Sequence, residues 1–142
     1  MSLIRFTSQT MGRPYRLGGY ADQKGADCFS NVWDYLGKKM DLPKEYEGLT
    51  MGTYAELYRQ DPEQAKCIMI CLMKDLLIEI PPHEALAGDV LRVSAKIGES
   101  VDDYLAIDGG NGNLICVAEK HGVSVWPKRF YRIKEAYRWP QQ

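Results

Sequence analysis

The chain has 142 residues, of which 45% are hydrophobic and 26% are charged, and its formal net charge is −1 at pH 7. This length and composition fit a single globular domain over residues 1–142 and argue against general disorder. Because the net charge is near neutral, it does not indicate a nucleic-acid partner. We interpret the locally basic stretch from Lys120 to Arg138 as a solvated strand face.

The sequence carries no membrane or export signal that we recognise. Its longest apolar run, Cys67 to Met73, is far shorter than the ~20 residues that cross a bilayer. The N-terminus lacks the charged and then apolar pattern of a secretory signal. We therefore expect no membrane partner and a product that is cytoplasmic as synthesised.

Metal and cofactor sites are not expected either. The four cysteines include no C-x-x-C pair, and only two histidines accompany them. Because structural zinc sites need closely spaced thiolates or imidazoles, a zinc site is improbable.

The first predicted element is a helix that begins at Cys28 and stops near Gly37. Its apolar residues recur at i, i+3, i+4 and i+7, the spacing of one helical face: Phe29, Val32, Trp33 and Leu36. A thiol on the first turn has two interpretations. It is either a small core residue, or a nucleophile whose pKa the helix N-terminus lowers.

Two further helices are predicted after a connecting loop at Met40 to Thr50. A short helix is expected from about Thr53 to Arg59. Asp61, followed by a proline and then a glutamine at the third helical position, is typical of a helix start. This second helix is expected to run to about Leu77, and the two prolines that follow bar any continuation.

Two cysteines fall inside this second helix. Cys67 and Cys71 are four residues apart and so share one helical face. Cysteine is among the most frequently buried residue types, and we therefore expect both to lie in the core.

The pattern changes to short strands beyond Pro82. Gly109 to Gly112 is a strong hairpin signal. Helices followed by strands predict an α+β fold in which N-terminal helices pack on a C-terminal antiparallel sheet. The segments rich in β-branched and aromatic residues are Asp89–Val93, Tyr104–Asp108, Asn113–Ala118, Gly122–Trp126 and Ala136–Trp139.

A family resemblance emerges around the cysteine. The segment Gly12-Arg13-Pro14-Tyr15-Arg16-Leu17-Gly18-Gly19, followed by Asp27-Cys28, resembles the G-x-P-Y-x-x-G-G…D-C opening of the NlpC-type cell-wall cysteine peptidases. These have a papain-like fold, and the likeness is strongest to the versions carried by phage tails and prophages. Further matching segments are Leu42-Pro43 near Tyr46, Ala87-Gly88-Asp89-Val90, Gly122-Val123 and Glu135-Ala136-Tyr137-Arg138.

The resemblance implies a peptidase that cuts the peptide stems of peptidoglycan or related small peptides. Its nucleophile is a cysteine at a helix N-terminus, which Cys28 matches. A histidine on the facing sheet takes the thiol proton, and a third polar residue orients that histidine. Tyr15 matches a family tyrosine that contacts the substrate or its oxyanion, although it could equally be an aromatic packed in a turn. The implied partners are a stem peptide or another small peptide, and phage tail proteins.

The sequence departs from the family at both expected imidazoles. Tyr104 stands at the histidine position, and Cys116 stands twelve residues further, where the third polar residue is expected. An unassisted thiol is only a few per cent thiolate at pH 7, and a tyrosine of pKa ~10 is a poor proton acceptor there. The sequence thus predicts weak or absent cleavage.

Three interpretations remain open. The chain is either a degenerate peptidase domain that binds or has a structural role, or a working cysteine hydrolase with an unexpected base, or an unrelated α+β domain with an inert Cys28. His121 is the leading substitute base, although its expected place in a turn would point it away from the centre of the sheet. His83 follows two prolines in a loop and is a weaker candidate.

Overall fold

The computed structural model describes residues 2–17, 25–40, 45, 48, 50–95 and 103–140. None of the helices in these ranges is long and apolar enough to cross a membrane. The helices are α1 (Leu3–Thr10), α2 (Cys28–Met40), α3 (Met51–Gln60) and α4 (Pro62–Leu76). The strands are β1 (Ile78–Ile80), β2 (Val90–Ala95), β3 (Asp103–Gly110), β4 (Asn113–Ala118), β5 (Gly122–Pro127) and β6 (Tyr131–Arg138).

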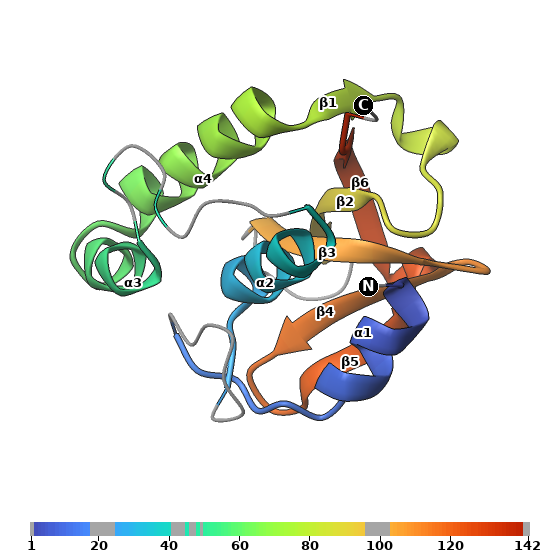
Figure 1. The fold of residues 1–142 in the computed structure, drawn as a ribbon, viewed down its shortest axis with the longest axis horizontal. Helices are drawn as coiled ribbons and strands as arrows, with labels where there is room; N and C mark the ends of the chain where they lie inside the picture. Colours follow the sequence, from blue (N-terminus) through green and yellow to red (C-terminus); the bar gives the residue numbers. More distant parts are fainter. Residues whose placement is uncertain are drawn as a thin grey trace.

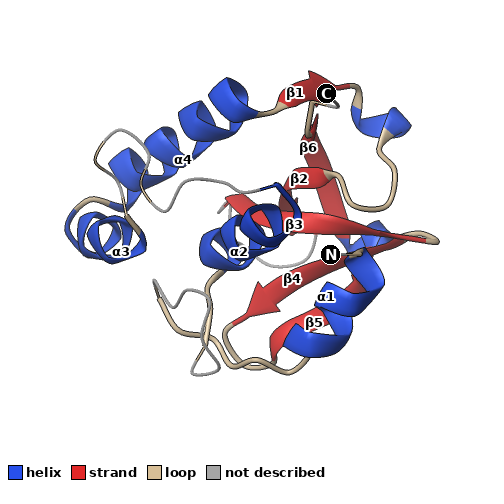
Figure 2. Cartoon of the chain, in the orientation of Figure 1, coloured by secondary structure: helices blue, strands red, loops and turns tan. Residues whose placement is uncertain are grey.

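The strands form one antiparallel sheet in the order β1-β6-β2-β3-β4-β5. Helix α2 lies across β3 and β4, α3 packs against α4, and α4 leads into β1 at the far edge (Figure 1). Colouring by secondary structure shows the strands together, with helices around them (Figure 2). The predicted α+β fold, with N-terminal helices on a C-terminal antiparallel sheet, is confirmed.

The β3–β4 hairpin turns where the sequence predicts. Asn111 has a φ of 55°, and the glycines on either side of it also have positive φ, a region that glycine and asparagine enter at little cost. The pairing runs from Gly110 opposite Asn113 to Ile107 opposite Ile115, where the ladder ends within the described parts of both strands. The regular pairing of the two strands therefore stops before Leu105.

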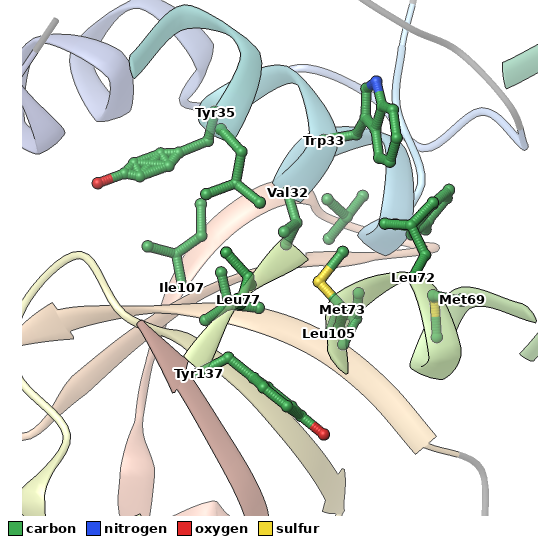
Figure 3. Close-up of a cluster of buried hydrophobic side chains, with 14 of the residues drawn as sticks. Val32, Trp33, Tyr35, Met69, Leu72, Met73, Leu77, Leu105, Ile107 and Tyr137 are labelled. Atoms are coloured by element: carbon green, nitrogen blue, oxygen red, sulfur yellow. The ribbon is translucent and has the colours of Figure 1, made fainter. Parts of the chain in front are cut away.

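The main core lies between α2, α4 and one face of the sheet. Val32 and Trp33 of α2 pack with Met73 of α4 and with Leu105 and Ile107 of β3 (Figure 3). Each of these side chains is almost fully buried, and burying one such side chain stabilises the fold by about 1.5–3 kcal/mol. This packing fixes α2, and with it Cys28, against the sheet.

A second cluster covers the opposite face of the sheet. Its buried members are Leu91, Val93, Ala106, Leu114, Cys116 and Ala136. Three half-buried aromatic residues pack against it from neighbouring strands: Tyr104 of β3, Trp126 of β5 and Tyr131 of β6. Aromatic rings from three strands are thus gathered on this face of the sheet.

Several boundaries differ from the predictions. Helix α2 continues through Gly37 to Met40, because an interior glycine costs only about 1 kcal/mol and burial of the α2 face outweighs that cost. Helix α1 was not predicted; Ser2 caps it by accepting from the Arg5 N–H, and Phe6 buries its ring. Strand β6 begins at Tyr131, five residues earlier than expected.

The prediction that Cys67 and Cys71 lie in the core is wrong, since both are exposed. The buried face of α4 consists of Ala65, Met69, Leu72 and Met73. The two cysteines share a face with each other but not with these residues. The average tendency of cysteine to be buried therefore misled the prediction, because the positions of these two cysteines along the helix place them on its solvent-exposed face.

The basic stretch near the C-terminus is solvated only in part. Arg132 and Lys134 are exposed on β6, as expected. Lys128, by contrast, forms an ion pair with buried Asp108, and Arg138 forms one with Asp89 at 2.8 Å. These ion pairs connect Lys128, just after β5, to β3, and Asp89, just before β2, to β6.

Candidate active-site cavity

A reciprocal cap places Cys28 at the first position of α2. The Ser30 N–H donates to Asp27 Oδ1 at 2.7 Å, and the Asp27 N–H donates back to Ser30 Oγ at 2.9 Å. This is the pattern of a capping box, which satisfies two backbone donors that the helix cannot pair itself. The cap fixes the direction in which the chain enters the helix.

The segment Gly12–Arg16, which we call the strap, joins this helix start to the edge strand β5. On one side the Ala26 N–H donates to the Pro14 carbonyl and the Arg16 N–H to the Ala26 carbonyl, both at 2.9 Å. On the other side the Gly12 N–H donates to the Val123 carbonyl at 2.9 Å, and the Val123 N–H donates to the Arg13 carbonyl at 2.8 Å. The strap thus carries Tyr15 to the side of Cys28.

All five candidate site residues from the sequence line one cavity of about 490 Å³: Tyr15, Cys28, Tyr104, Cys116 and His121. The cavity lies between the start of α2, the strap and the ends of the central strands. The five residues come from the strap, the start of α2, strands β3 and β4, and the β4–β5 turn. The structure brings these residues together, and their chemical roles depend on how they interact.

On the sheet side, the position expected for the third polar residue is occupied by a thiol that faces a tyrosine. The Sγ of Cys116 lies 3.8 Å from the Oη of Tyr131. Cys116 is buried on β4, and Tyr104 is half-buried on β3.

His121 lies in the turn between β4 and β5 and is exposed, yet it lines the cavity. Its ring packs edge-on against Trp126 of the edge strand β5, with the centroids 5.6 Å apart. The Trp126 Nε1–H donates to Ser124 Oγ at 2.7 Å and so holds this indole in place. His83 lies apart, exposed in a short 3-10 helix beside Glu84.

The surroundings of Cys28 favour its neutral thiol. Burial raises the pKa of Cys28 to about 12, and the negative charge of Asp27 adds to this rise. Backbone hydrogen bonds from Leu105 and Phe29 lower the pKa but do not offset it, and the neighbouring Cys116 raises it further. At pH 7 the sulfur is therefore protonated, the opposite of what a helix N-terminus alone would give.

The tyrosines around the cavity are neutral as well. Burial, followed by the charges of Asp27 and Glu119, raises the pKa of Tyr15. Burial also raises the pKa of Tyr54 and of Tyr131. Their hydroxyls can donate and accept hydrogen bonds near neutral pH, but they cannot act there as general bases.

Sequence reasoning missed part of the cavity wall. Tyr54 and Tyr58 of α3 and Tyr131 of β6 all line it. The two α3 tyrosines are four residues apart, and this helical spacing was a usable signal; their ring centroids lie 6.0 Å apart. No local signal in the sequence links Tyr131 to Cys116, since only the sheet brings them together.

Some elements of the family pattern lie outside the described residues, namely Gly18-Gly19, Leu42-Pro43 and Tyr46. Within the described ranges, no group of three or more histidine, cysteine, aspartate or glutamate side chains is placed to hold a metal ion.

Comparison with known proteins identifies the fold. No protein-family model matches the sequence, and no curated protein matches it significantly. The structure is similar to the crystal structure of the NlpC/p60 domain of the peptidoglycan hydrolase SagA, with a TM-score of 0.61 and 19% identity, over 94% of this chain and 93% of that one. The chain thus has the α+β fold of an NlpC/p60 domain, as the sequence resemblance implied.

Proposed function

We propose that this protein is an NlpC/p60-type domain that binds the peptide stem of peptidoglycan, or a related small peptide, in the cavity without cleaving it. The observation that carries this proposal is the state of Cys28. The thiol occupies a nucleophile's position at a helix start, but its pKa is raised to about 12 by burial and by Asp27.

The chemistry of peptide cleavage explains how a raised pKa of Cys28 supports this proposal. A thiol whose pKa is raised this far above its ordinary value is almost entirely protonated at pH 7. Cleavage also needs an acid to protonate the leaving amine, and Tyr104 stands where the resemblance predicts a histidine. A site that lacks both the thiolate and the acid can hold a peptide but has little means to cut it.

The cavity wall suits a small peptide. Aromatic rings from α3 and β5 offer apolar faces, and tyrosine hydroxyls offer hydrogen bonds. Carboxylates at Asp27 and Glu119 and ammonium groups at Lys66 and Lys120 also line the cavity. Both ends of a zwitterionic peptide therefore have groups of opposite charge to meet.

A second function, a working cysteine hydrolase, is favoured by one observation. His121 lines the same cavity as Cys28, and its exposed turn could bring the imidazole toward the sulfur when a ligand binds. In that case binding would have to lower the pKa of Cys28 by supplying the proton acceptor that the unliganded site lacks.

A synthetic peptidoglycan stem peptide distinguishes the two functions. We expect calorimetry to show saturable binding and mass spectrometry to show no more product than with Cys28→Ser. Trp126→Ala should weaken binding. Trp139→Ala should not, because Trp139 does not line the cavity.

Two results would contradict the proposal. Product formation that is lost in both Cys28→Ser and His121→Ala would establish the hydrolase instead. Equal, undetectable binding by the wild type and by Trp126→Ala would show that the cavity does not take this ligand.

We extend the proposal to where the protein works. The resemblance to phage-type members supports a protein that is made in the cytoplasm and then associates with a virion or its tail. Co-purification with tail particles after induction of a prophage that encodes this chain would support this location. Recovery of the chain from the cytosolic fraction alone would argue against it.

A further inference from the structure

A buried ion pair ties the strap to the helix that begins with Cys28. Arg13 Nη1 lies 3.0 Å from Asp34 Oδ2, and both side chains are only 3% exposed. Asp34 lies in the second turn of α2, so the contact crosses from the strap to the body of that helix. It adds a third attachment to the two sets of backbone hydrogen bonds described above.

Stability alone is a poor explanation for this pair. Taking two charges out of water is costly, and buried ion pairs are often no more stabilising than apolar residues of similar volume. The guanidinium is also incompletely satisfied, since the buried Arg13 Nε has no hydrogen-bond partner. The pair fixes the position of the strap relative to α2, because the two charges meet only when Arg13 lies against that helix.

The backbone of Arg13 is held equally closely. Its carbonyl accepts from the Val123 N–H, and a Cβ added at Gly122 would lie only 2.1 Å from that carbonyl oxygen. Arg13 is therefore fixed to β5 through its backbone and to α2 through its side chain. Two residues further along, Tyr15 enters the wall of the cavity and pairs with Ala26, two residues before Cys28.

We propose that Arg13 is a positioning residue for this cavity: its ion pair with Asp34 holds the strap against α2 and thereby keeps Tyr15 in the cavity wall, where it limits access to the half-buried Cys28. The inference rests on the proposed function only in taking this cavity as the binding site. It concerns the reactivity of Cys28 and does not depend on which peptide binds.

Alkylation of Cys28 by iodoacetamide, followed by peptide mass spectrometry, tests this role. The exposed Cys67 and Cys71 in the same molecule serve as internal references for the reagent. The main variant is Arg13→Met with Asp34→Leu, which replaces both charges by apolar side chains and so avoids leaving one charge buried alone. We expect Cys28 to react about tenfold faster than in the wild type, because local opening of the strap widens the access of the reagent to the half-buried sulfur.

Two matched variants separate positioning from general destabilisation. Arg138→Met breaks another partly buried ion pair, with Asp89, whose residues do not line the cavity, and it should leave the Cys28 rate unchanged. Arg13→Lys keeps a positive charge beside Asp34 and should therefore leave the Cys28 rate closer to the wild-type value than the double variant does. If the double variant does not fold, Asp34→Asn removes the charge at nearly constant shape and should also accelerate the reaction.

An unchanged Cys28 rate in a folded Arg13 or Asp34 variant would overturn the proposal. So would an equal acceleration in Arg138→Met. A fast reaction in the wild type would instead contradict the proposed function, and the comparison among variants would still judge Arg13 independently.

Discussion

Two opposing influences act on Cys28, and their magnitudes decide its state. A helix N-terminus stabilises a nearby negative charge by about 0.3–1 kcal/mol, and by about 2 kcal/mol in favourable cases. The rise of the Cys28 pKa to about 12 corresponds to about 4 kcal/mol in favour of the neutral thiol. This is larger than the stabilisation of the thiolate by the helix N-terminus. Burial contributes most, and the Asp27 carboxylate adds to it, although the same carboxylate caps the helix. The best local cap is thus also an obstacle to ionising the thiol.

Replacing Asp27 by asparagine should separate these two roles. Asparagine caps helices about as well as aspartate, so the free energy of unfolding should change by less than about 1 kcal/mol. Removing the negative charge should lower the pKa of Cys28, and its alkylation should begin at lower pH than in the wild type. The measurement is the pH dependence of Cys28 alkylation, with urea unfolding as the check on the cap. An unchanged pH dependence would mean that burial alone sets the pKa.

At the scale of elements, the strap and β5 meet too closely to admit a side chain. Gly122 has a φ of +67° and faces the Arg13 carbonyl, whereas Gly112 has a similar φ of +76° and open space around it. The two glycines therefore share a backbone requirement and differ in their surroundings. This difference makes them a matched pair for testing how tightly the strap is seated.

We predict that Gly122→Ala destabilises the fold more than Gly112→Ala. Both changes place alanine at positive φ, at a cost of order 1–3 kcal/mol. Only Gly122→Ala also forces the strap away from β5, so its urea midpoint should fall further, and Cys28 should become more reactive only in this variant. Equal losses of stability, with equal Cys28 rates, would show that the strap is loosely held.

Elements with strong local signals could be predicted from the sequence, and elements that depend on distant packing could not. Helix α4 begins as predicted, because Asp61 and Pro62 act through nearest neighbours. Strand β1 has three residues and, among the described strands, pairs only with the C-terminal end of β6, so nothing local in the sequence indicates it. The early start of β6 likewise depends on its pairing with Ser94 and Ala95 of β2.

At the scale of the whole molecule, the family resemblance predicted which residues converge, because a shared fold brings the same positions together. Cys28, Tyr104 and Cys116 line one cavity although 76 residues separate the first two. The resemblance did not predict that Tyr54, Tyr58 and His121 line the cavity, because this depends on how helices and turns pack around it. The contact of His121 with Trp126 joins a turn residue to a residue near the far end of β5, and no pattern within the turn itself indicates it.

The pH profile of Cys28 alkylation in the wild-type protein is the most direct test of whether this cavity has lost its thiolate. We predict very slow modification at pH 7, while the exposed Cys67 and Cys71 react, and a rise in the Cys28 rate only as the pH approaches about 12. Rapid modification of Cys28 at pH 7 that disappears in His121→Ala would contradict this, since it would show an ionised nucleophile with a working base.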